Sequence, residues 1–121
     1  SAELMVNHAR NYIRENYRKP VIVEDLAQQA GISTNYFRTI FKERTGITIY
    51  DYTTQIRLEK AKELLKDERQ KVKDIGVMVG YESSAHFGSL FRKKFGMTPN
   101  EYRRKILEGK STVQKRHEEN I

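Results

Sequence analysis

An internal repeat is the feature of this sequence that most restricts how the chain can fold. The segment that begins at Val23 returns at Val72, about fifty residues later, with its glycines and hydroxyl residues as well as its apolar positions. The spacing grows by one residue between Gly80 and Ser83, which predicts an insertion at Glu82. A chance likeness of two amphipathic helices would not reproduce the glycines and caps, so we expect two copies of one helical unit. The matching pairs are Gly31 and Gly80, Ser33 and Ser83, Phe37 and Phe87, Phe41 and Phe91, Gly46 and Gly96, Thr48 and Thr98, and Tyr52 and Tyr102.

Each copy has the pattern of a helix-turn-helix. In the first copy, residues 23–30 predict a short helix whose expected core side chains are Leu26, Ala27 and Ala30. A tight turn at residues 31–32 leads into a second helix, which Ser33 caps and Gly46 stops. A short helix, a glycine turn and a second helix make a helix-turn-helix. The second helix of this copy has an apolar stripe of Phe37, Ile40 and Phe41.

The remaining segments are expected to be helical as well. Residues 3–17 predict a first helix with Met5, Ala9, Tyr12 and Ile13 on its core face, and residues 98–107 a closing helix capped by Thr98. We therefore expect an all-α fold with a first helix-turn-helix subdomain (3–47), a long linker helix (48–66) and a second subdomain (67–107). The charged tail, residues 108–121, either extends the last helix or is disordered.

Composition and charge narrow the function. The 121-residue chain carries a net charge of +7, which favours a polyanionic partner. The sequence has no cysteine, no apolar run near the ~20 residues of a membrane span, and no phosphate loop or nucleophile motif. Its three histidines lack metal-ligand spacing. We expect no enzyme activity, no metal and no cofactor.

Double-stranded DNA is the expected partner, because a major groove of ~12 Å admits one helix and two units can reach successive grooves ~34 Å apart. The polar stripes of the two outward helices supply the expected base-reading residues, and nearby basic or ring side chains supply the phosphate contacts. The expected base-reading residues are Asn35, Arg38, Thr39, Ser84, Ala85, Gly88 and Ser89. The expected phosphate contacts are Tyr36, Lys42, Arg44, His86, Arg92, Lys93 and Lys94.

Several residues keep an alternative interpretation. Arg38 either pairs with guanine or contacts a phosphate or solvent. Tyr36 and His86 either touch phosphate or are partly buried in the core. The small residues around Gly88 either bring the backbone close to DNA or leave that half to bind through phosphates and shape. At the level of function, the alternatives are a helical protein-interaction module and, third, RNA binding.

The sequence resembles the DNA-binding domain of the AraC/XylS family of bacterial transcription regulators over roughly residues 5–106. The resemblance is carried by the first outward helix, by Arg57 and Leu58, and by the run from Phe91 to Pro99 followed by Tyr102 and Arg103. Departures are Gly76, where alanine is commoner, Ile22 at a usual capping position, and Gly88 on the second outward helix.

The resemblance implies seven helices, with two helix-turn-helix subdomains joined by the long central helix. It implies a cytoplasmic promoter-binding regulator, often an activator that contacts RNA polymerase. Family members usually carry a separate sensing or receiver domain. We therefore expect this chain to be an excised C-terminal domain, with a small stand-alone regulator as the alternative.

Overall fold

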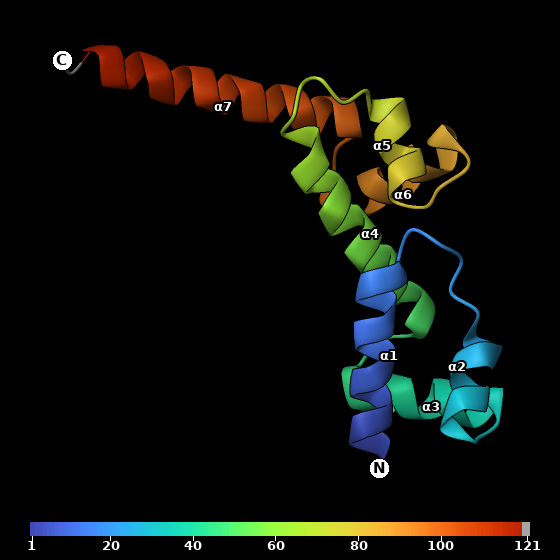
Figure 1. The fold of residues 1–121 in the computed structure, drawn as a ribbon. Helices are drawn as coiled ribbons and strands as arrows, with labels where there is room; N and C mark the ends of the chain where they lie inside the picture. The colour runs from blue at the N-terminus through green and yellow to red at the C-terminus, as the bar shows by residue number, and fades with distance from the viewer. Residues whose placement is uncertain (120–121) are drawn as a thin grey trace. The chain divides into compact units, whose positions relative to one another are not determined.

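Residues 1–119 contain seven helices and no strand. The helices are labelled in Figure 1. The computed structural model describes the backbone of these residues and the side chains of residues 1–110. Among them, no helix is both long and apolar enough to cross a membrane. The prediction of an all-α fold with seven helices is confirmed. The helices are α1 (Ala2–Asn16), α2 (Val23–Ala30), α3 (Thr34–Thr45), α4 (Ile49–Leu65), α5 (Val72–Met78), α6 (Ser84–Phe95) and α7 (Pro99–Glu119).

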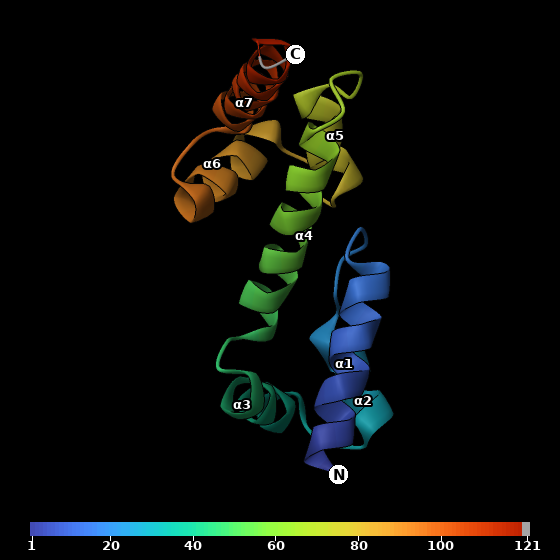
Figure 2. The ribbon, with the colours of Figure 1, turned by 90° about the vertical axis from the view of Figure 1, so that its left-hand side faces the viewer.

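The chain divides into two compact units, Ser1–Glu59 and Lys60–Ile121, and the boundary falls inside α4. The first unit holds α1, α2, α3 and the beginning of α4 (Figures 1 and 2). The second holds the end of α4 with α5, α6 and α7. Each unit therefore has one helix-turn-helix, α2–α3 or α5–α6, with one helix before it and one after it.

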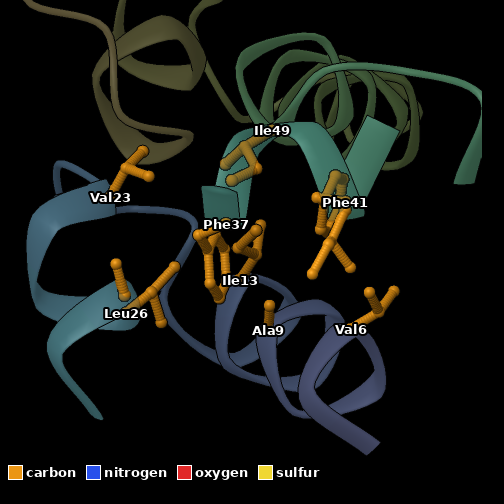
Figure 3. Close-up of a cluster of buried hydrophobic side chains, with 10 residues drawn as sticks. Val6, Ala9, Ile13, Val23, Leu26, Phe37, Phe41 and Ile49 are labelled. Atoms are coloured by element: carbon orange, nitrogen blue, oxygen red, sulfur yellow. The ribbon is translucent and has the colours of Figure 1, made fainter. Parts of the chain in front are cut away.

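The core of the first unit lies between α1, α2, α3 and the start of α4. Figure 3 shows the side chains of Ile13, Leu26 and Phe37 pointing toward one another from three different helices. Phe37 and Phe41 are 1% and 0% exposed. The Phe41 ring also meets the Tyr52 ring edge to face, with centroids 5.6 Å apart. The apolar stripe of α3 thus fixes which side of this helix is left to solvent.

Two expected core residues of this unit are on the surface instead. Tyr12 is 37% exposed, whereas Val6, on the other edge of the apolar stripe, is buried. Ala30 is also exposed because it ends α2, where the chain turns away at Gly31. Both misassignments concern the edge of an apolar stripe, whose centre (Ala9, Ile13) is buried as expected.

Aromatic rings fill the second unit. Phe87 and Phe91 on α6 are buried. The centroid of the Phe91 ring lies 4.7 Å from the centroid of the Phe95 ring and 5.7 Å from that of the Tyr102 ring. The Lys62 ammonium lies 4.5 Å from the centroid of the Phe95 ring, a cation–π contact that ties α4 to the end of α6. The two phenylalanines of α6 play the same part as those of α3.

The two motifs repeat each other down to single hydrogen bonds. The hydroxyls of Ser33 and Ser83 each accept from the N–H three residues on, at 3.2 Å in both copies. Gly46 and Gly96 end α3 and α6 in the left-handed conformation, and each N–H donates to a carbonyl at 2.8 Å. These bonds confirm the caps and stops expected from the sequence.

The predicted insertion is located by the turn hydrogen bonds. In the first copy, the N–H of Ile32 donates to the Ala27 carbonyl, and in the second the N–H of Tyr81 donates to that of Gly76. Both turns therefore match through Tyr81, and the next residue with a counterpart is the cap Ser83. The extra residue is Glu82, as expected, and its side chain is exposed.

The charged segment between α4 and α5 is anchored by polar contacts. Asp67 accepts from the backbone N–H and the Nε of Arg69, both at 3.0 Å, and from an Nη at 3.1 Å. The side-chain hydrogen bond from Arg69 is the main reason why the pKa of Asp67 lies below its ordinary value. At the other end of the second unit, α7 runs through residues 108–119, and residues 120–121 lie outside the described part.

Two glycines inside helices of the second unit give a matched stability prediction. A Cβ on Gly76 would lie 2.9 Å from Cδ2 of buried Phe87, whereas a Cβ on Gly88 would meet nothing within 4 Å. We expect Gly88→Ala to raise the free energy of unfolding by about 1 kcal/mol, through helix propensity alone. Gly76→Ala should lower it by about 1 kcal/mol, because overpacking of ~1–3 kcal/mol outweighs that gain. Urea denaturation followed by circular dichroism measures both, and an equal rise in the two variants would contradict the close packing at Gly76.

Candidate nucleic-acid interface

The exposed face of α3 gathers the polar side chains that the sequence singled out. With Phe37 and Phe41 buried, Asn35, Arg38 and Thr39 are exposed, and Lys42 continues the stripe one turn later. Positions i, i+3, i+4 and i+7 share one side of a helix, so the structure brings these four side chains together.

The contacts within this stripe differ. The Thr39 hydroxyl donates to the Asn35 carbonyl at 3.0 Å, which leaves the methyl group of Thr39 for apolar contact. Arg38 lies beside a hollow of about 420 Å³ that Lys42 and Thr48 also line. Arg38 is thus exposed beside a hollow that the residues at the start of α4 also line.

The matching face of α6 is smaller and flatter. Ser84, Ala85 and Ser89 are exposed there, and Gly88, at the position of Arg38, is half-buried. The hollow beside α6, about 330 Å³, is lined by Gly88 and Ser84 together with the beginnings of α5 and α7. Where α3 extends a long cationic side chain, α6 thus offers backbone and hydroxyl groups.

Two residues of this second hollow were missed by the sequence analysis. Lys73 on α5 and Asn100 on α7 both line it, and each supplies hydrogen-bond donors. They were missed because neither lies on the outward helix. Their signal in the sequence is their place as the second residue of α5 and of α7, directly after Val72 and Pro99.

The expected phosphate contacts do not all lie on one side. Lys42 and Arg92 continue the two polar stripes. Lys93 projects from α6 in a direction rotated by about 80° about the helix axis from that of Ala85. Arg44 and Lys94 come nine residues after the start of their stripes, so they project about 180° from them. Both are exposed at the C-terminal end of their helix, where a positive charge also suits the helix dipole.

Tyr36 and His86, the matched ring residues, are on the surface rather than in the core. Tyr36 is 56% exposed, and His86 is exposed with its ring edge to face against Tyr81, the centroids 5.6 Å apart. Neither ring is fully buried, although the His86 ring packs against buried Tyr81. Both rings lie near the start of their helix, beside the polar stripe.

Positive charge is distributed unevenly between the units. The first unit has eight Lys and Arg against seven Asp and Glu, a net charge of +1. The second has fifteen against nine, a net charge of +6. The unit with the more varied polar stripe therefore contributes little to long-range attraction of a polyanion, and the unit with small side chains contributes most of it.

Among residues 1–110, whose side chains the structure describes, no group of three or more His, Asp and Glu side chains is placed to hold a metal ion. A third hollow, about 560 Å³, lies between α1, α2 and α3, with Leu4, Met5 and Ile32 among its walls and no Lys or Arg. The two hollows beside α3 and α6 have cationic residues in their walls and are candidates for binding a polyanion. A smaller hollow of about 240 Å³, which Arg38 and Arg57 line, is a further one.

A family model described as a helix-turn-helix domain matches residues 26–105. Among curated relatives, the HTH-type transcriptional activator RhaR of Pectobacterium carotovorum is 36% identical over 97 residues, which are 80% of this chain and 34% of that protein. The melibiose operon regulatory protein of Escherichia coli K12 is 32% identical over 103 residues, 85% of this chain and 34% of that protein. The chain thus spans about a third of the length of these relatives.

A solved structure has the same fold. The C-terminal domain of AraT, a response regulator from Geobacillus stearothermophilus, superposes with a TM-score of 0.78 at 33% identity, and the match covers 84% of each chain. The match therefore leaves out less than a fifth of this chain.

Proposed function

Because the chain belongs to the AraC/XylS family of transcription regulators, as a DNA-binding domain, we propose that α3 and α6 enter successive major grooves of one promoter duplex. The observation that carries this proposal is the matched pair of helices, each held by two buried phenylalanines with a polar stripe outward. A groove of ~12 Å accepts one such helix, and successive grooves lie ~34 Å apart on one face of the duplex.

The two helices divide the recognition in this proposal. On α3, Arg38 pairs with guanine O6 and N7, Asn35 pairs with adenine, and the Thr39 methyl meets a thymine methyl. On α6, Ser84, Ala85, Gly88 and Ser89 allow close approach of the backbone and read shape and water-bridged contacts. Exposure of all three α3 side chains, and the open space at Gly88, support this division.

Phosphate contacts supply most of the affinity. Lys42, Arg92 and Lys93 lie on or beside the stripes and, with Tyr36 and His86, can reach the backbone on either side of a groove. Lys73 and Asn100 join them at the second hollow. Arg44 and Lys94, on the opposite sides of their helices, contact phosphate only where the duplex bends toward them.

The chain forms one part of a longer regulator in this proposal. The matched residues make up only 34% of each of these two relatives, and the AraT match is a C-terminal domain of a response regulator. A sensing or receiver domain therefore precedes this one, and the whole protein acts in the cytoplasm as an activator that contacts RNA polymerase. RhaR is named as an activator, which supports that direction of regulation.

Selection from random duplexes tests the proposal as a whole. Repeated selection at several salt concentrations should enrich one site with two half-sites about one helical turn apart. Affinity should fall steeply with salt, because bound Lys and Arg release counterions from the duplex. A protein-interaction module would enrich nothing, so a library that stays random would overturn DNA recognition.

Arg38→Ala tests the division between the helices. Removal of a bidentate guanine contact should cost ~1–3 kcal/mol of discrimination and relax the preference at one base position, while other positions stay selective. Binding is measured on the selected site and on its three variants at that position. A loss of equal size on every sequence would make Arg38 a phosphate contact instead.

Arg92→Ala tests the phosphate contacts. Affinity should fall by a similar factor on specific and random duplexes, and the slope of log K against log salt should decrease by ~1. Lys66→Ala, an exposed lysine at the end of α4, is the control and should leave the slope unchanged. Loss of preference at a single base in Arg92→Ala would instead place this residue in base recognition.

A further inference from the structure

Two arginines make the same pair of hydrogen bonds in the two units. In the first, Nε of Arg57 donates to the Tyr17 carbonyl at 2.7 Å, and an Nη donates to the Lys19 carbonyl at 3.0 Å. In the second, Nε of Arg103 donates to the Leu65 carbonyl at 3.0 Å, and an Nη donates to the Asp67 carbonyl at 3.1 Å. In both units one edge of a guanidinium thus spans two carbonyls that are two residues apart.

These carbonyls lie at equivalent places in the two units. Tyr17 and Lys19 follow α1, where the chain leaves that helix for α2. Leu65 ends α4, and Asp67 lies in the connection to α5. The last carbonyls of a helix have no partner within it, so a charged donor there is stabilising and also suits the negative end of the helix dipole.

The short helices that follow these connections begin without side-chain caps. Ile22 and Lys71, at the cap positions of α2 and α5, make no side-chain cap hydrogen bond. α2 has eight residues and α5 has seven, lengths at which a helix depends on its surroundings rather than on its own propensity. The placement of each short helix therefore depends on how the preceding connection is held.

Each arginine comes from the helix that follows the motif. Arg57 lies on α4, which is separated from α3 by three residues. Arg103 lies on α7, which is separated from α6 by the same number. The arginine thus joins the chain entering the motif to the chain leaving it. Since α2 packs on α3 and α5 packs on α6, a shift of the entry segment is passed on to the outward helix.

The two arginines are not partners in the sequence repeat. The position that matches Arg57 is Leu107, and the position that matches Arg103 is Thr53, whose hydroxyl donates to the Ile49 carbonyl at 2.9 Å. The same bond pattern is therefore built from two different places on the helix that follows the motif. Two unlike solutions that hold the same connection indicate that the connection has to be held.

We infer that Arg57 and Arg103 are positioning residues, each of which holds the connection into its helix-turn-helix and so fixes how that motif presents its outward helix. This inference rests on the proposed function for its effect on DNA binding. The effect is local to one unit, which separates it from a general contribution to stability.

The test compares Arg57→Ala and Arg103→Ala in selection from random duplexes, below the unfolding temperature of each variant. Arg57→Ala should lower the affinity for the selected site about tenfold. Its base preference should be lost only in the half-site that α3 reads. Arg103→Ala should lose preference only in the other half-site. Arg14→Ala and Arg104→Ala, which remove exposed arginines nearby on α1 and α7, should leave the selected profile as it is. Equal loss in both half-sites, or an unchanged profile, overturns the inference.

Amide hydrogen exchange without DNA gives an independent measurement. Exchange should rise about tenfold or more in residues 17–26 of Arg57→Ala and in residues 66–76 of Arg103→Ala, with the core of α3 and α6 still protected. Arg57→Lys and Arg103→Lys, which can make one of the two bonds, should fall between wild type and alanine and also serve if an alanine variant does not fold. Unchanged exchange in these segments overturns the inference. A wild-type chain that selects no DNA would overturn the proposed function instead, and exchange would still decide whether the arginines hold the connections.

Discussion

Burial of two phenylalanines on one side of each outward helix is the constraint on which the rest of the molecule depends. Phe37 and Phe41 on α3, and Phe87 and Phe91 on α6, are all almost fully buried. Burying a side chain of this size contributes roughly 1.5–3 kcal/mol to stability. The two phenylalanines on each helix therefore leave that helix only one stable rotation about its axis. Which polar side chains face a partner is decided by this packing and not by the polar residues themselves.

This constraint explains what the sequence could predict. Apolar spacing, serine caps and glycine stops are local signals, and they located the helices, the turns and the inserted Glu82. The misassignments of Tyr12 and Ala30 arise at the edges of apolar stripes, where the direction of the neighbouring chain decides burial. Other features were not predicted, because neither periodicity nor the repeat reports contacts between different helices. Lys73 and Asn100 line the hollow beside α6 from two other helices. Arg57 and Arg103 donate hydrogen bonds to carbonyls 40 and 38 residues away in the chain.

The two units keep the same backbone plan while their surfaces differ. Caps, stops and turn bonds agree within about 0.2 Å in length between the copies. Where the first copy has Arg38, however, the second has Gly88. Where the first copy has Ala27 on α2, the second has Gly76 on α5, and the Phe87 ring packs closely against it. Backbone geometry is thus the shared requirement, and side chains outside the cores are free to specialise.

The uneven charge has a kinetic consequence. Attraction between a protein and a polyanion acts over about a Debye length, ~8 Å at physiological salt, and grows with net charge. The second unit, at +6, is therefore drawn to a duplex before the first, at +1. Under the proposed division of recognition, a second unit loosely held on phosphates would let the tethered first unit sample base sequence at high local concentration and release a wrong site without the chain leaving the DNA. The search for a target and the decision to stay would then belong to different halves of one small chain.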